Sequence, residues 1–289
     1  MASCCCCARE LHVVKPSCRC GGHVPWQGSL LRTLETFPCR CIQMFWGSPQ
    51  TYKVTKVSAE DRERSREYCL ANDRTFYVHA PYCCNLAKPV NENERAIGTM
   101  RQLLEQVNDV PGAVVAHIGF GKEVLMVAET INQLEVLGVL RHSNFDRVPF
   151  HFLLECASGK KNHLGHTWQD LHRLYEALDK SKVGLCIDTQ HAFSAGMSKF
   201  ENYEDVVRVW DASEAINGHG ISMLHLNDSL VSFGDGADRH APLGTGHIWG
   251  SRDNGLQAII RIARDSNLDL ISETSDVMSD IAIVRRYAE

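Results

Sequence analysis

Histidine and carboxylate side chains close the apolar segments of this sequence. His79 ends TFYVH and His117 ends AVVAH. Glu155, Asp188 and Glu273 end FHFLLE, VGLCID and DLISE. Any one of them alone is more often a hydrogen-bonded structural residue or a solvated charge. An unpaired charge is costly to bury. Because a histidine or carboxylate recurs at the same end of five apolar segments, the sequence predicts that these side chains meet at one site.

Four more side chains of the same two types lie near these positions. His191 follows Asp188 by three residues, and His225 lies in MLHLND. Asp238 and His240 lie in the loop sequence ADRH. Imidazole and carboxylate together are ligands for zinc or manganese. The sequence therefore predicts a metal centre built from nine residues.

The remaining histidines serve as a comparison. His23 follows Gly22 in an apolar segment and could line the floor of the site, whereas His151 lies within a segment rather than at its end. We interpret the others, which lie in the N-terminal head, in loops or in helical stretches, as surface or structural residues. They are His12, His142, His163, His166, His172, His219 and His247.

The segments that must position the nine residues are typical of parallel strands covered by helices. Short runs rich in Val, Ile, Leu and Phe, most of them apolar on both faces, predict strands. They are residues 21–24, 41–45, 75–79, 113–117, 150–155, 183–188, 221–226 and 269–273. Charged amphipathic stretches predict helices at 58–73, 92–108, 167–181 and 200–216. Ser58 and Thr167 have the residue types and spacing of helix N-caps.

The spacing of the runs favours one closed architecture. From Phe45 to Glu273, the ends of successive runs lie 33 to 47 residues apart, which is about the length of a βα unit. Eight such units favour a single-domain α/β fold, the (β/α)8 TIM barrel, although periodicity alone would also fit a doubly wound sheet. In a barrel, the C-terminal strand ends form the catalytic face.

Composition limits the class of protein. The chain has 289 residues, 44% hydrophobic and 22% charged, with a net charge of −5, which argues against a generally basic DNA-binding surface. No apolar run approaches the roughly 18 residues that a membrane span needs. The N-terminus lacks the apolar core of a secretory signal, so we expect an intracellular protein of the nucleus or cytoplasm, with a weak organelle presequence as the alternative.

The N-terminal head is rich in cysteine. Six of the 13 cysteines fall within the first twenty residues, and in a reducing compartment most should be free thiols. We expect residues 1–20 to form a flexible extension and residues 21–289 to form the barrel domain. A redox clip or a metal site in the head are the alternatives, although a run of four cysteines does not match the spacing of zinc modules.

Three motifs resemble a known family. The sequence VGLCIDTQHAFSAG (183–196), the long segment MLHLNDSLVSFGDGADRHAPLGTGHIWG (223–250) and DLISET (269–274) resemble those of endonuclease IV, the zinc-dependent apurinic/apyrimidinic (AP) endonuclease family 2. Weaker similarity reaches through FYVHAPYCCNLAKP (76–89) to GGHV (21–24). The resemblance covers roughly residues 21–285, and its C-terminal motifs are highly specific.

The resemblance implies three Zn²⁺ ions per chain, in part replaceable by Mn²⁺, and a ligand set in which Glu155 bridges two of them. The three groups are His79, His117 and Glu155; Glu155, Asp188, His225 and Glu273; and His191, Asp238 and His240. It also implies that a zinc-bridging hydroxide attacks the phosphate 5′ to an abasic site in duplex DNA. The products would be a 3′-hydroxyl and a 5′-deoxyribose phosphate, as base-excision repair requires.

Metal binding also answers the objection from net charge. Three Zn²⁺ ions would bring the chain from −5 to +1. Exposed basic residues of the loops could then contact phosphates, although each alone is more often a solvated charge. They are Lys88, Lys122, Lys160, Lys161, Arg239 and Arg252. We expect duplex DNA as the partner, no membrane association, and a monomer.

Lesion recognition is where the sequence departs from the family. The resemblance implies that Tyr82 fills the gap left by the missing base, with core packing as its other interpretation. Bacterial members carry an arginine in the loop after the second strand, where this chain reads FWGSPQTY with Gln50 at the corresponding position. Either Trp46 or Gln50 could replace that arginine as the wedge.

Two other classes of function compete. A metal-dependent sugar isomerase or epimerase can use a similar barrel, but typically with fewer ligands around one or two ions. Five candidate ligand histidines and the ADRH loop favour the phosphodiesterase. A DNA-binding or scaffold protein on a decayed barrel would have lost ligands, and none is lost here.

Overall fold

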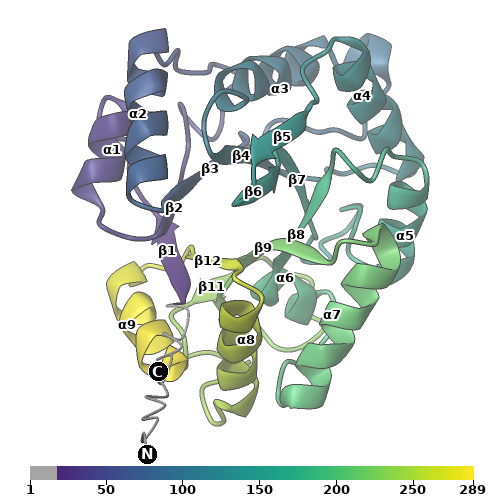
Figure 1. The fold of residues 1–289 in the computed structure, drawn as a ribbon. Coiled ribbons are helices and arrows are strands. Elements are labelled where there is room, and N and C mark those ends of the chain that lie inside the picture. The colour runs from purple at the N-terminus through teal and green to yellow at the C-terminus, as the bar shows by residue number, and fades with distance from the viewer. Residues whose placement is uncertain (1–17) are drawn as a thin grey trace, which may run out of the picture.

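The computed structural model describes residues 18–289, which form a closed barrel of eight parallel strands (Figure 1). The barrel strands are β1 (Arg19–His23), β2 (Cys41–Met44), β3 (Thr75–His79), β4 (Gly112–His117), β7 (Phe152–Glu155), β8 (Gly184–Asp188), β9 (Ile221–His225) and β12 (Asp269–Ser272). Their order around the barrel follows the chain, and β1 pairs with β12 to close it. The predicted TIM barrel is confirmed, and the doubly wound sheet is excluded.

Helices surround the barrel and connect its strands (Figure 1). They are α1 (Leu30–Thr36), α2 (Ala59–Ala71), α3 (Glu94–Val107), α4 (Leu125–Val136), α5 (Trp168–Glu176), α6 (Thr189–Ser194), α7 (Tyr203–Asn217), α8 (Asn254–Asp265) and α9 (Val277–Ala288), with a 3-10 turn, η1 (Val90–Glu92), before α3. The predicted N-caps are confirmed, because the side chain of Ser58 accepts a hydrogen bond from the Asp61 amide, as Thr167 does from that of Asp170. In the part of the chain described, no helix is both long and apolar enough to cross a bilayer.

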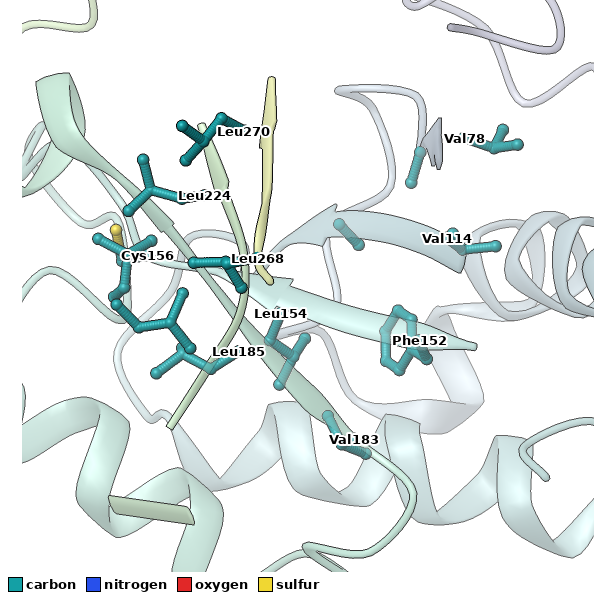
Figure 2. Close-up of a cluster of buried hydrophobic side chains, with 14 of the residues drawn as sticks. Val78, Val114, Phe152, Leu154, Cys156, Val183, Leu185, Leu224, Leu268 and Leu270 are labelled. Atoms are coloured by element: carbon teal, nitrogen blue, oxygen red, sulfur yellow. The ribbon is translucent and has the colours of Figure 1, made fainter. Parts of the chain in front are cut away.

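Alternating strand residues build two apolar layers. One side of each strand packs toward the helices, as Figure 2 shows for Val114, Phe152 and Leu185. The other side fills the barrel interior, where Val115 and Leu153 are fully or almost fully buried. Both layers are apolar, which explains why the strands read as continuous hydrophobic runs rather than as alternating ones.

The first strand begins at Arg19, two residues before the expected start of the barrel domain. Cys18 and Cys20, which we placed in the head, are buried in the core, whereas Cys4, Cys5, Cys6 and Cys7 lie outside the described residues. The Arg19 side chain is 3% exposed, and its Nε donates to Asp269 Oδ1 over 2.5 Å. This pair joins the first strand of the barrel to the last.

The sequence did not predict a short hairpin between α4 and β7. Strands β5 (His142–Phe145) and β6 (Val148–Phe150) form it, so the predicted strand 150–155 is divided at His151. The His151 ring instead donates through Nδ1 to the Gly112 carbonyl over 2.9 Å. Val148 and Phe150 pack with the residues of the barrel interior, so the hairpin closes the end of the barrel where the strands begin.

We predict that Arg19→Met lowers the free energy of unfolding by about 3–5 kcal/mol, because it leaves the buried Asp269 carboxylate without its cation. Urea unfolding followed by circular dichroism measures the change. The matched control is Arg101→Met, which breaks an exposed ion pair with Glu105 and should cost about 1 kcal/mol or less. Equal losses in the two variants would contradict the role of the Arg19 pair.

Candidate metal centre

The strand register brings the predicted residues together at the C-terminal end of the barrel. His117 of β4 lies opposite Glu155 of β7, and Asp188 of β8 lies opposite His225 of β9. Glu273 follows β12 directly. All of these side chains belong to strand ends on the same face of the barrel, so the charged strand ends converge there.

The first group joins His79, His117 and Glu155. Glu155 is 1% exposed, and its Oε2 lies 3.3 Å from His79 Nε2 and 3.2 Å from His117 Nε2. The other carboxylate oxygen of Glu155 points to a second group, where it lies 3.0 Å from His225 Nδ1. One buried carboxylate therefore faces both groups, which is the arrangement that the resemblance to endonuclease IV implied.

The second group adds Asp188 and Glu273 to Glu155 and His225. Nδ1 of His225 lies 3.2 Å from Glu273 Oε2 and 3.8 Å from Asp188 Oδ2. Asn227 contacts both acidic residues, because its Nδ2 donates to Asp188 Oδ2 over 2.7 Å and its Oδ1 accepts from the main-chain amide of Glu273 over 2.8 Å. The four donor atoms lie within 4.8 Å of one another.

The third group forms where a short helix meets a hairpin. Asp188 caps α6 by accepting from the His191 amide over 2.9 Å, which places His191 directly beyond the strand end. The hairpin of β10 (Asp228–Ser229) and β11 (His240–Ala241) carries His240. His240 Nε2 lies 3.5 Å from Asp188 Oδ2 and 3.3 Å from Asp238 Oδ1. Asp238 Oδ2 also lies 3.4 Å from His191 Nε2.

The membership of this third group differs in one respect from that implied by the resemblance. The donor atoms that cluster most tightly with His191 and His240 belong to Asp188, whereas Asp238 contacts both histidines from a side chain that is 47% exposed. Asp188 thus lies between the second and third groups. The buried Asp228 shapes the loop, since its carboxylate accepts from the amides of Gly244, Gly246 and Ile248.

The donor atoms fit zinc. Two ligands of a tetrahedral zinc ion, each about 2.0–2.2 Å from it, lie about 3.3–3.5 Å apart. The nitrogen–oxygen distances within the three groups cluster around this value. Nε2 of His191 and Nε2 of His240 are buried without a hydrogen-bond partner. Because Nδ1 of His191 donates to the Cys156 carbonyl over 2.9 Å, a neutral ring directs the lone pair of Nε2 toward Asp238. A cation held by the two rings would satisfy both Nε2 atoms.

Two carboxylates of the site are held in their ionised form by neighbouring histidines. Burial raises the pKa of Glu155, but the His117 and His225 imidazoles outweigh it and hold that pKa well below its usual range. Burial likewise raises the pKa of Asp238, while His191 and His240 lower it further than burial raises it. Ionised carboxylates crowded at one end of a barrel create a strong preference for bound cations.

Two open cavities meet at this centre. The smaller, about 300 Å³, is lined by His23, Phe45 and most of the candidate ligands. The position of His23 on this wall agrees with its interpretation from the sequence. The larger, about 550 Å³, shares Tyr82 with the first and extends to Phe120 and His163. His163, which we interpreted as a surface or structural residue, is half-buried, and its ring stacks on Phe120 in the wall of this cavity.

The residues expected to touch DNA occupy different environments. Tyr82 is 55% exposed and Arg239 lines the larger cavity, so both can reach a ligand. Gln50 is exposed in a loop joined to Tyr82 through the hydrogen bond from the Tyr82 amide to the Pro49 carbonyl. Trp46 is only 3% exposed and packs on Phe76, so its proposed role as a wedge is wrong.

The basic residues proposed to contact phosphates are all exposed. They are Lys88, Lys122, Lys160, Lys161, Arg239 and Arg252. Sequence reasoning missed Asn227 and Gln43, which hydrogen-bond to candidate ligands and are both fully buried. Gln43 is the one polar residue of the apolar run CIQMF, and that interruption was the available signal.

Comparison with known proteins first identifies the class of fold to which the chain belongs. The family described as xylose isomerase-like TIM barrel matches residues 31–275. Among solved structures, endonuclease IV from Thermus thermophilus superposes with a TM-score of 0.78 at 24% identity, covering 93% of this chain and 98% of that one. A D-tagatose 3-epimerase-like protein superposes with a TM-score of 0.64 at 18% identity, covering 92% and 96%. Both likenesses concern the fold.

Proteins of similar sequence identify the family within this class of fold. A probable endonuclease 4 of Akkermansia muciniphila is 30% identical over 76% of this chain and 77% of its own length. One from Mycobacterium leprae is 29% identical over 84% and 89%. Apurinic-apyrimidinic endonuclease 1 of Plasmodium falciparum is 27% identical over 84% of this chain, which spans only 41% of that longer protein. The chain belongs to the endonuclease IV family.

We predict that removing metal by chelation lowers the melting temperature by about 10 °C. A bound ion whose free concentration is about 1,000 times its dissociation constant adds roughly 4 kcal/mol to the free energy of unfolding. Differential scanning calorimetry before and after EDTA dialysis measures the shift. Zn²⁺ should restore the original value, whereas Mg²⁺, which prefers oxygen ligands, should not. A chelated protein that melts at the same temperature as the untreated one would contradict metal binding at this centre.

Proposed function

We propose that the chain is a zinc-dependent AP endonuclease of base-excision repair. It cleaves the phosphodiester bond 5′ to an abasic site in duplex DNA and leaves a 3′-hydroxyl and a 5′-deoxyribose phosphate. The observation that carries this proposal is the convergence of nine histidine and carboxylate side chains in three adjoining groups, in a chain of the endonuclease IV family. Zn²⁺, in part replaceable by Mn²⁺, is the proposed cofactor.

The proposed activity assigns a role to the metal and to individual residues of the centre. When bound, zinc would supply Lewis-acid stabilisation of phosphate charge and an ionised water as the attacking group. Glu155 faces two of the three groups and so fixes their separation. The side chain of Asp238 is half exposed, more so than those of the other three carboxylates, and it lines both cavities. Its position allows it to adjust when a phosphate enters.

The surroundings of the centre supply DNA binding. Lys160, Lys161 and Arg239 belong to loops that follow β7 and β10 on the same face as the nine residues. Contacts of this kind with phosphates carry affinity without sequence preference, and they weaken as salt is added. Tyr82 lies between the two cavities with its ring near those of His79 and His117. An aromatic ring at this position can stack where a base is missing.

A sugar isomerase or epimerase is the second candidate, because the fold also resembles that of a D-tagatose 3-epimerase-like protein. The two functions differ in the number of ions they need. Three groups of ligands favour the nuclease, and the third group, with His191 and His240, has no task in an enzyme with a single ion. Elemental analysis separates them, since about three zinc ions per chain favour the nuclease and one manganese ion favours the isomerase.

We predict that zinc-loaded protein nicks a duplex oligonucleotide bearing one tetrahydrofuran site, and that Glu155→Gln lowers the rate by about 1,000-fold. The amide keeps the shape of the side chain but removes the charge shared by two groups, which costs several kcal/mol of transition-state stabilisation. Denaturing gel electrophoresis of labelled strands measures nicking. Glu176→Gln, an exposed carboxylate on α5, is the control and should cleave normally. Absence of nicking by wild-type protein with zinc or manganese would refute the proposed activity.

We predict that Tyr82→Ala weakens binding to abasic duplex by about 5- to 150-fold, since stacking against an aromatic side chain contributes roughly 1–3 kcal/mol. Fluorescence anisotropy in a Glu155→Gln background measures binding without cleavage. Tyr203→Ala removes an equally exposed tyrosine from α7 and should bind as the parent does. If both tyrosine variants bind with the parent's affinity, Tyr82 has no part in lesion recognition.

A further inference from the structure

The side chain of Gln43 is fully buried beneath the second group of candidate ligands. We propose that Gln43 is a positioning residue that fixes which nitrogen of His225 faces the metal and how the Glu273 carboxylate is oriented. This inference rests on the metal centre of the proposed function, but it concerns a residue of this chain that is distinct from the nine ligands.

The orientation of the Gln43 amide follows from its partners. Nε2 of Gln43 lies 2.6 Å from Glu273 Oε1, and an ionised carboxylate can only accept, so this atom must be the amide nitrogen. Its second N–H faces His23 Nδ1 over 3.1 Å. The contact with Glu273 alone fixes which end of the amide is the nitrogen, so the carbonyl oxygen of Gln43 must face His225.

That oxygen determines the tautomer of His225. Gln43 Oε1 lies 2.8 Å from His225 Nε2, and because an amide oxygen only accepts, the proton of the imidazole is placed on Nε2. Nδ1 then carries the lone pair. It points at Glu155 Oε1 and Glu273 Oε2, which lie 3.0 and 3.2 Å away. Gln43 thus directs His225 Nδ1 and Glu273 Oε2 toward the same position, where the second group would hold a metal ion.

Other histidines of the centre are held in a different way. His79 and His191 each donate through Nδ1 to a main-chain carbonyl, that of Ala80 over 2.7 Å and that of Cys156 over 2.9 Å. These two rings consequently present Nε2. His225 is reversed relative to them, and its partner is a side chain. The backbone cannot be removed by substitution, whereas Gln43 can, so the second group is open to a direct test.

The choice of a neutral amide also matters for the charge of the site. Four carboxylates already crowd this end of the barrel, and an acidic partner for His225 would add a fifth. An amide instead offers a donor to Glu273 and an acceptor to His225 without changing the net charge. Gln43 can therefore orient two ligands without adding a charge, so the net charge of the site is set by the nine candidate ligands.

The test is the zinc affinity of Gln43→Met, a substitution of similar size that removes both hydrogen bonds. Competition with a chromophoric chelator should show one of three zinc ions bound about 10- to 100-fold more weakly, while the other two keep wild-type affinity. Cys41→Ala is the matched control, since Cys41 lies two residues away on the same inward face of β2 and its Sγ donates to the Leu270 carbonyl rather than to a candidate ligand. Wild-type affinity at all three positions in folded Gln43→Met overturns the proposal.

A second measurement uses wild-type protein and does not depend on how the variant folds. Nitrogen-15 NMR of zinc-loaded protein with labelled histidine should show the His225 proton on Nε2, whereas His79 and His191 should carry theirs on Nδ1. A proton on Nδ1 of His225 overturns the proposal. Neither experiment involves DNA, so loss of the proposed nuclease activity and failure of the Gln43 inference give separate results.

Discussion

Electrostatic repulsion among the carboxylates at one end of the barrel is the constraint on which the rest of the structure depends. Glu155 and Asp188, which are buried, are brought together with Glu273 and with a fourth acid, Asp238, whose side chain is half exposed. Such a cluster is stable only with bound cations, with hydrogen-bond donors on its free oxygens, and with a rigid support. The barrel supplies that support, because most of these acids and histidines are fixed at or beside the ends of paired strands.

The opposite end of the barrel performs another task. There the Arg19–Asp269 pair is extended by Tyr77, whose hydroxyl donates to Asp269 Oδ2 over 2.8 Å, and the hairpin of β5 and β6 covers the interior. Groups that stabilise the fold and groups that could perform chemistry thus lie at opposite ends of the same strands, a separation typical of TIM barrels. Charged side chains at the stabilising end form ion pairs with one another, whereas the acids and histidines at the other end surround positions where cations could bind.

The residues that the sequence predicted to meet, and that the structure brings together, share one property, which is that their chemistry conflicts with their surroundings. A histidine or glutamate at the end of an apolar strand stands out, so the ends at His79 and Glu155 could be read directly. Gln43 could not, since a single amide within CIQMF has many structural uses, and the two candidate ligands that it contacts lie 182 and 230 residues away. The division of the predicted strand 150–155 into β6 and β7 was missed because VPFHFLLE has no turn signal at His151. Trp46 was misjudged because the sequence does not show which side of a loop faces the core.

The pairing of β1 with β12 has a consequence for how the molecule is made. The contact between Arg19 and Asp269 spans 250 positions, and Glu273 follows four residues later. During translation, a chain that has not yet released its last strand from the ribosome has neither a closed barrel nor a complete ligand set. Closure and completion of the candidate metal centre then occur in the same late step. A nascent chain that stalls before this point therefore cannot assemble the second group of ligands, whatever part of the barrel it has already formed.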